Sequence, residues 1–345
     1  MTNNYSTAVM LGVLESLENQ PPTFLRDRFF TVEVRSDAEE ISFDVVDKKR
    51  RIAPFVSPLV RGKVREKRGY HSKTFKPAYV KPKDILSPLD TIKRRPGEAY
   101  GGTLTLGQRR DIWLRTLLAE QDEDITMREE VMCAEALRLG QVTVTGEGYG
   151  TVVVNFGRDV ALREVLSGSN LWNNEGAKPL AYIEEKAVLV RKKSGGAVVR
   201  DVVCGTDAFT AILARMDKDE KALLLNSQNR GQTTSVQLGP RTAEKYVFQG
   251  TIGQFNFWTY SDTYQDENGD EKEVFPPNEI LLVGSEVEGH RCYGAILDMD
   301  SLIPLPRFPK TWRENDPSVE IIMTQSAPLM VPKRPNATFS AVVLP

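Results

Sequence analysis

The chain has 345 residues, of which 40% are hydrophobic and 27% charged, so it can bury a substantial core and does not have the composition of a disordered protein. Its 45 basic and 47 acidic residues leave a net charge of −2, which gives the molecule as a whole no electrostatic signature of nucleic-acid binding. The charge is uneven along the chain, however. Residues 48–95 contain sixteen Lys or Arg and three acidic residues, so this segment carries about +13 and the remainder about −15.

The chain opens with a short predicted helix followed by two predicted strands. Residues 7–18 have an amphipathic pattern that ends before Pro21-Pro22, and residues 24–30 (FLRDRFF) form an apolar group. FTVEV (30–34) and EISFDVV (40–46) alternate apolar and polar residues, which predicts two strands around a polar turn.

Residues 50–95 differ in kind from their neighbours, because they combine the basic excess with five prolines and few apolar side chains. Two extended runs, at 59–68 and 72–80, flank Gly69–Ser72 and predict a long hairpin with its turn there. An isolated two-stranded ribbon is marginal in water. We therefore expect this hairpin to lie on another surface.

Residues 108–139 form the strongest predicted helix. Neither Pro nor Gly interrupts the segment, Gly140 follows it, and at 1.5 Å per residue it would be roughly 48 Å long. Its apolar residues recur at spacings of three, four or seven and define a core-facing stripe. The stripe consists of Leu114, Leu118, Ile125, Met132, Ala136 and Leu139.

The second half of the chain reads as mixed helices and strands. VTVT and TVVV predict a hairpin over 142–154, and residues 179–193, 197–205 and 207–216 predict a helix, a buried strand and a helix capped by Asp207. Strands in 246–264 and 273–284 are joined across Asn268-Gly269, a type I′ turn signal, and two more strands close the chain in 319–345. The fold class is α+β, with helices flanking a mainly antiparallel sheet.

The sequence predicts no catalytic, metal or cofactor site. His71 and His290 have no partner at ligand spacing, and the glycine-rich GEGYG (146–150) leads into a strand where a dinucleotide loop would lead into a helix. Asp298 and Asp300 are the weakest alternative, as carboxylates of an unrecognised metal-dependent enzyme.

The cysteines and the N-terminal residues indicate in which cellular compartment the protein is made. Cys133, Cys204 and Cys292 lack the spacing of a disulfide framework or a zinc site, and we expect buried thiols. The first residues lack a signal-peptide pattern, and no apolar run is long enough to cross a bilayer. We expect a soluble protein made inside the cell, with no membrane partner.

The basic segment 48–95 allows two functional hypotheses. Aromatic residues interleave with the basic ones, as in proteins that stack single-stranded nucleic acid, so the chain could be a nucleic-acid-binding protein. We favour the alternative, in which a basic ribbon lies on an acidic face of a neighbouring identical subunit. The predicted contact residues are Lys63, Arg65, Lys67, Arg68, Tyr70, Phe75 and Tyr79.

Several stretches, in order along the chain, resemble the lambda-type major capsid proteins of tailed bacteriophages (the gpE family). They include FVSPLVRGKV (55–64), FKPAYVKPK (75–83) and QSAPLM (325–330), together with YSTA (5–8), VTVTGE (142–147) and FPKTW (308–312). The resemblance therefore covers nearly the whole chain, although no single motif carries it.

This resemblance implies the HK-ninety-seven-type phage capsid fold. The expected parts are an N-terminal arm (1–35), an E-loop (50–90) that lies across an adjacent subunit, and a P-domain (36–49, 91–174 and 301–345) whose spine helix is 108–139. The remaining part is an A-domain (175–300).

The resemblance also implies a function without enzymatic activity or cofactors. The chain would be the major head protein that self-assembles, as pentamers and hexamers, into an icosahedral shell around packaged double-stranded DNA. It would be made in the host cytoplasm and end in the virion. Expected partners are further copies of the chain, a decoration protein, a separate scaffold protein and a portal, and we assume no covalent crosslink between subunits.

Overall fold

A computed structural model describes residues 6–16, 23–38, 40–46, 52–53, 55–59, 61, 70–93, 104–146, 148–217, 221, 245–299 and 304–345. Its helices are α1 (Thr7–Glu15), α2 (Leu25–Phe29), α3 (Pro88–Ile92), α4 (Leu106–Leu139), α5 (Pro179–Lys193) and α6 (Thr206–Arg215), with short 3-10 turns at Val160–Leu162, Gly168–Asn170 and Pro335–Ala337. The strands of the first half are β1 (Val32–Arg35), β2 (Ile41–Val46), β3 (Tyr70–Phe75), β4 (Lys83–Leu86), β5 (Gln141–Gly146), β6 (Tyr149–Asn155) and β7 (Arg163–Val165). Those of the second half are β8 (Val199–Cys204), β9 (Tyr246–Ile252), β10 (Phe255–Tyr260), β11 (Thr263–Gln265), β12 (Glu271–Glu273), β13 (Glu279–Gly284), β14 (Gly289–Tyr293), β15 (Phe308–Asn315), β16 (Ser318–Gln325), β17 (Pro328–Pro332) and β18 (Thr338–Val342).

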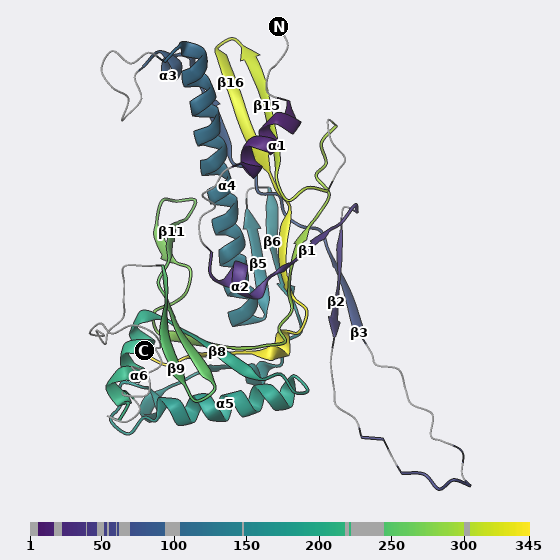
Figure 1. The fold of residues 1–345 in the computed structure, drawn as a ribbon, viewed down its shortest axis with the longest axis vertical. Coiled ribbons are helices and arrows are strands. Elements are labelled where there is room, and N and C mark those ends of the chain that lie inside the picture. The colour runs from purple at the N-terminus through teal and green to yellow at the C-terminus, as the bar shows by residue number, and fades with distance from the viewer. Residues whose placement is uncertain are drawn as a thin grey trace.

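Helix α4 runs along most of the body and connects its two ends (Figure 1). A capping box starts it, because Thr105 Oγ1 accepts from the Gln108 N–H at 3.2 Å and Gln108 Oε1 accepts from the Thr105 N–H at 2.9 Å. Gly140 ends it in the left-handed conformation, at φ 66°, where a Cβ would lie 2.6 Å from Arg158 Cβ. The predicted helix over 108–139 is confirmed in type and extent.

The predicted apolar stripe of α4 is buried along most of its length. Leu114, Leu118, Ile125 and Met132 are buried, whereas Leu139 is only half-buried. A straight helix drifts by about 20° per heptad relative to a seven-residue repeat, so Leu139, three heptads beyond Leu118, has turned off the packed face.

The six-stranded sheet, in the order β7-β18-β13-β8-β10-β9, lies beyond the C-terminal end of α4 (Figure 1). Its central strand β13 is buried on both faces. Leu281 and Val283 point into the core shared with α4, while Ile280 and Leu282 point into the core beneath α5 and α6. Two strands of this sheet, β7 and β18, lie outside the expected A-domain (175–300), one before it and one after it in the sequence.

The other end of α4 carries a three-stranded sheet, β15-β16-β4, and α1. Here Met10 and Leu14 of α1 pack with Leu114 and Leu118 of α4 and with Ile322 of β16. A further sheet, β1-β14-β17, places β1 parallel to β14, so the predicted strands at 30–34 and 40–46 do not pair with each other. The described part of the expected arm thus packs on its own subunit.

The basic segment pairs differently from our prediction. The stretch Tyr70–Ser72, predicted as a turn, lies in β3, and β3 pairs antiparallel with β2, with Ile41 opposite Phe75 and Val46 opposite Tyr70. Ile41 and Phe43 of β2 are buried, and Phe75 of β3 packs against the same core. Strand β2 therefore offers β3 an apolar face, which the sequence of residues 59–68 does not provide. The turn prediction at 69–72 was wrong, and most of 59–68 lies outside the described residues.

Four local predictions in the second half also need correction. Residues 246–264 split into β9, β10 and β11, because Gly253 at φ 60° turns the chain between β9 and β10. Helix α6 starts from Gly205 rather than Asp207, since the N–H groups of 207 and 208 donate to the Pro277 carbonyl at 3.1 and 2.9 Å. The chain closes with three strands, β16, β17 and β18, instead of two.

The fourth correction concerns the turn between β11 and β12. The Gly269 N–H donates to the Asp266 carbonyl at 2.9 Å, and Gly269 adopts φ 85° while Asn268 does not adopt a positive φ. This is the pattern of a type I turn followed by a left-handed glycine. The hairpin is confirmed, but its predicted type I′ turn was wrong.

The buried face of α4 predicts unequal effects of two substitutions on the same helix. Leu118→Asp should lower the free energy of unfolding by at least about 3 kcal/mol or make the subunit insoluble, because it buries an unpaired charge. Arg128→Ala removes only an exposed 3.5 Å ion pair with Glu267 and should change it by less than about 0.5 kcal/mol. Urea unfolding measures both, and equal effects would contradict this assignment of the helix faces.

Candidate assembly site and its buried carboxylate hub

Two adjacent carboxylates of α4, Glu129 and Glu130, are fully buried. Glu130 Oε1 accepts from the N–H groups of Phe24 and Leu25 at 3.1 and 2.8 Å, and Glu130 Oε2 accepts from the Arg26 N–H at 2.8 Å. The Tyr260 hydroxyl of β10 donates to Oε1 at 2.8 Å. Glu130 thus caps the start of α2 and ties it to the six-stranded sheet.

Glu129 binds two arginines that are far apart in the sequence. Its Oε2 lies 2.8 Å from Arg26 Nε, and its Oε1 accepts from Arg307 Nη1 at 2.6 Å and from the Tyr293 hydroxyl at 3.1 Å. Arg307 also pairs with Asp122 at 2.6 Å. We call Glu129, Glu130 and their partners Arg26, Tyr260, Tyr293 and Arg307 the carboxylate hub.

The pKa directions in the hub follow from burial and from these pairs. Burial raises the pKa of Glu130. The hydrogen bonds from the backbone N–H groups and Tyr260 lower it, but burial has the larger effect. Burial raises the pKa of Tyr260 and Tyr293, and the neighbouring carboxylates add to the rise. For Arg307, burial lowers the pKa, but the Glu129 charge outweighs it and the net pKa is raised, so the guanidinium stays charged.

A second buried charge cluster joins the C-terminal end of α4 to the six-stranded sheet. Glu279 of β13 accepts from Arg138 Nε at 3.0 Å and from Arg163 Nη1 at 3.5 Å. Arg158 Nη1 donates to the Leu137 carbonyl at 2.8 Å, which satisfies a carbonyl at the helix end. Burial and the nearby Arg163 lower the pKa of Arg158 to about 10.

The predicted intersubunit residues divide into two groups. Lys63, Arg65, Lys67 and Arg68 lie outside the described residues, and Tyr70 begins β3. Phe75 packs against the main core of its own subunit, and the Tyr79 hydroxyl donates to the Ala295 carbonyl at 2.8 Å and accepts from the Leu297 N–H at 3.3 Å. Phe75 and Tyr79 therefore anchor the base of the basic segment to its own subunit.

Asp298, one of the two candidate metal residues, has other partners. Asp298 accepts from Lys310 Nζ at 2.9 and 3.1 Å and from Gln325 Nε2 at 3.3 Å, while Asp300 lies outside the described residues. Burial lowers the pKa of His290, and the side chain of His71 is not described. In the described part of the chain, no three His, Cys, Asp or Glu side chains come close enough to share a metal ion.

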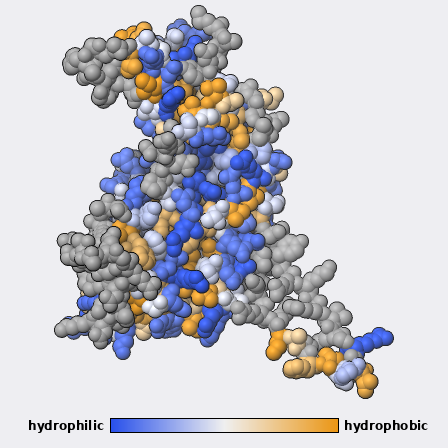
Figure 2. All heavy atoms as spheres, viewed as in Figure 1, coloured by the Kyte–Doolittle hydropathy of each residue, from blue (hydrophilic) through white to orange (hydrophobic). Residues whose placement is uncertain are grey.

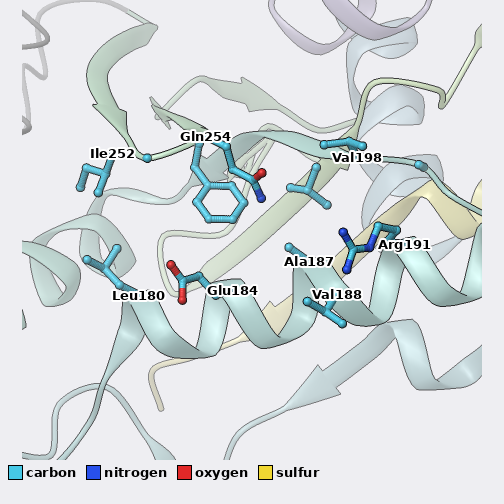
Figure 3. A pocket seen from close by; sticks show the side chains of 12 residues that line it. Leu180, Glu184, Ala187, Val188, Arg191, Val198, Ile252 and Gln254 are labelled. Atoms are coloured by element: carbon cyan, nitrogen blue, oxygen red, sulfur yellow. The ribbon is translucent and has the colours of Figure 1, made fainter.

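A cavity of about 340 Å³ lies between α5 and the turn that joins β9 to β10 (Figure 3). Apolar side chains form most of its lining, and Glu184, Arg191 and Gln254 are its polar members. Its lining contains no Ser, Thr, Cys, Lys or His side chain. Among the described helices, none combines the length and the apolar character needed to cross a bilayer.

Sequence reasoning missed the carboxylate hub. The only local signal was Glu129-Glu130 beside Ile125 and Met132, on the helix face that was predicted to be buried. Charged residues are almost never fully buried without partners, so this position could have suggested a buried ion pair. Arg26 and Arg307 could not have been chosen as the partners, because they lie more than 100 residues away in the sequence.

Comparisons with known proteins match this chain over nearly its whole length. The profile of the family described as phage major capsid protein E matches residues 6–343. The major capsid proteins of Escherichia phage N15 and Escherichia phage lambda are 30% and 29% identical, each over 96% of this chain and 97% of the relative. The crystal structure of the putative capsid protein of a prophage of E. coli CFT073 superposes with a TM-score of 0.74 at 21% identity, covering 98% of this chain and 99% of that one.

The geometry of the carboxylate hub predicts a large effect of one truncation. Glu130→Ala should lower the free energy of unfolding by at least about 3 kcal/mol, because three backbone N–H groups and the Tyr260 hydroxyl lose their buried acceptor. Glu123→Ala, an exposed position on the same helix, is the matched control and should be nearly silent. Thermal unfolding followed by circular dichroism compares the two, and a silent Glu130→Ala would contradict the capping role.

Proposed function

This chain belongs to the phage major capsid protein E family, and from that premise we propose how its structure serves the assembly of a head shell. The chain is a major capsid protein without enzymatic activity, and its fold is that of tailed-phage capsid subunits. The observation that carries this conclusion is the family match over residues 6–343, together with the near-complete structural superposition.

In our proposal the subunit works as a rigid body with a projecting ribbon, formed by β2 and β3. Phe43 packs edge-on against Phe156 with ring centroids 5.7 Å apart, and Lys73 Nζ donates to the Asn155 carbonyl at 2.7 Å. These contacts hold the base of the ribbon against β6, so the ribbon leaves the body in a set direction (Figure 1). Each subunit then makes several weak contacts with its neighbours. Once one contact has formed, the effective concentration of the remaining binding surfaces rises, so the contacts together are stronger than any one of them.

The proposed partners are those of a head shell. Copies of the chain would form pentamers and hexamers, and these would enclose packaged double-stranded DNA. A decoration protein, a scaffold protein and a portal would complete the particle. In this scheme residues 1–35 form the arm, 50–90 the E-loop, and 175–300 the A-domain, while 36–49, 91–174 and 301–345 form the P-domain.

We also propose that the basic part of the E-loop meets acidic surface of a neighbouring copy. Support comes from the excess of about +13 in residues 48–95 and about −15 elsewhere. An acidic group on α4 consists of Glu120, Glu123 and Asp124, and Asp84 lies close to it. Burial raises the pKa of Asp124, and the negative charges of the other three residues raise it further. Basic side chains from a second subunit would relieve this repulsion.

Electron microscopy and sedimentation of the purified chain test the function. We expect capsomers or closed shells of megadalton mass. A chain that stays monomeric, alone and with a scaffold protein, would contradict the proposal. A monomer whose mobility shifts only with added DNA would favour the nucleic-acid-binding hypothesis.

Charge reversal separates the two roles of the basic residues. Replacing Lys63, Arg65, Lys67 and Arg68 together by Glu should reduce the shell yield at least tenfold after nuclease treatment, because like charges would then face each other across the interface. Exchanging Lys and Arg at the same four positions keeps the charge and is the control. Normal empty shells that fail only to bind DNA would contradict the intersubunit role.

A further inference from the structure

Helix α5 forms one wall of the cavity that Figure 3 shows. Its inner side is fixed on the six-stranded sheet, because side chains such as Ile183 and Val190 are fully buried in the core beneath it. The α5 residues that line the cavity recur at spacings of three and four, so they form one stripe along the helix. They are Leu180, Glu184, Ala187, Val188 and Arg191.

The rest of the cavity is built by the sheet. The turn between β9 and β10 contributes residues 252–255, and the chain that enters β8 contributes residues 197–199. The small side chains of Ala187 and Ala197 are both buried at its base, so the helix and the turn stay apart above them. We call this cavity the α5 groove. Its volume of about 340 Å³ lies at the lower end of the range of about 300–1,000 Å³ that binding sites occupy.

Two opposite charges mark the ends of the α5 groove. Glu184 and Arg191 are seven residues apart on α5, which is about 10 Å along a helix axis. Figure 3 shows both side chains on the groove side of the helix, with Gln254 on the opposite wall. Among the described residues, none forms a hydrogen bond or an ion pair with these three side chains. They are therefore available to a partner.

The middle of the α5 groove is apolar and open to solvent. Val188 and Val198 are 39% and 41% exposed. Figure 2 shows apolar and polar side chains side by side along the lower edge of the body, where α5 lies in Figure 1. From its N-terminal to its C-terminal end, the stripe on α5 thus presents an acidic, an apolar and a basic part.

We propose that the α5 groove binds an amphipathic helix of another protein. In this mode of recognition, apolar side chains spaced by three, four and seven residues enter a groove. A helix antiparallel to α5 places an acidic residue beside Arg191 and, seven residues later, a basic residue beside Glu184. This order also agrees with the dipole of the bound helix, which favours acidic residues near its N-terminus and basic residues near its C-terminus. The site is separate from the contacts that our assembly proposal uses.

The spacing of the two charges favours a helix over an extended chain. A helix presents residues i and i+7 on one face, about 10 Å apart, which matches the separation of Glu184 and Arg191. An extended chain covers the same distance in about three residues, at roughly 3.3 Å each. Residues three apart on a strand point to opposite faces, so they cannot both meet the charges of the α5 groove.

A second copy of the chain is the alternative occupant, because its own α5 has the same order of charges. Two antiparallel α5 helices would bring Val188 of both copies together, with Glu184 of each beside Arg191 of the other. Such a contact is self-complementary and ends with two subunits. It would not extend a shell, and we therefore favour another protein.

Labelled synthetic peptides of about 20 residues, long enough to form a helix, test the site on the unassembled full-length chain. The matched peptide carries Glu, then Leu three and four positions later and Lys seven positions later. A second peptide exchanges the Glu and the Lys, and a third has a helix-breaking Pro within the same segment. Fluorescence anisotropy measures the Kd of each.

We expect the matched peptide to bind at least about tenfold more tightly than either of the other two, because exchanged charges face like charges and the Pro prevents the helix. Equal binding of all three peptides, or no binding of the matched one, would overturn the inference and leave the assembly function untouched.

Exchanging the charges of the α5 groove is the matched control on the protein. Glu184→Lys with Arg191→Glu changes two exposed side chains and keeps the net charge. The preference should reverse, so that the peptide with exchanged charges binds at least about tenfold more tightly than the matched one. An unchanged preference would place peptide binding elsewhere on the protein and overturn the inference.

The apolar centre of the α5 groove is tested by Val188→Asp, which should weaken binding of the matched peptide at least about tenfold. Val160→Asp, at a position 90% exposed and outside the groove, should leave the Kd unchanged. Circular dichroism checks that both variants are folded. Equal Kd values for the two folded variants would contradict the docking site.

Val188→Cys separates another protein from a second copy. In an antiparallel α5 pair the two thiols would meet, and diamide, which accepts two electrons and two protons from each thiol pair, would link them. The native cysteines are buried, which keeps the background low. We expect no dimer on a non-reducing gel. A linked dimer would overturn the inference in favour of self-association.

Discussion

Glu129 and Glu130, side by side on α4, are the two charges on which the packing of distant segments depends. Burying a carboxylate costs several kcal/mol unless it is paired and fully hydrogen-bonded. Here the donors come from residues 24–26, from Tyr260 and Tyr293, and from Arg307, so the cost is offset only when all these segments are in place. The carboxylate hub thereby selects one arrangement of α2, α4 and the strands that carry Tyr260 and Tyr293.

A second buried charge cluster fixes the six-stranded sheet at the C-terminal end of α4. Glu279 of β13 binds Arg138, and Arg158 satisfies the Leu137 carbonyl, so the six-stranded sheet is tied to α4 by ions as well as by Leu281 and Val283. Ion pairs and apolar contacts thus fix the sheets against α4 at both places, which suits a subunit that has to repeat in a shell.

The sequence alone determined those parts whose signal is local. The helix over 108–139, the hairpin over 142–154 and the helix at 179–193 follow from periodicity and from their end residues, and the collinear stretches such as FVSPLVRGKV indicated the family. Only the tertiary structure decided that β3 pairs with β2, that Gly205 starts α6 beside Pro277, and that Glu129 and Glu130 are buried. Periodicity specifies the type of an element and its apolar face, whereas strand partners and buried charges depend on contacts with residues far away in the chain.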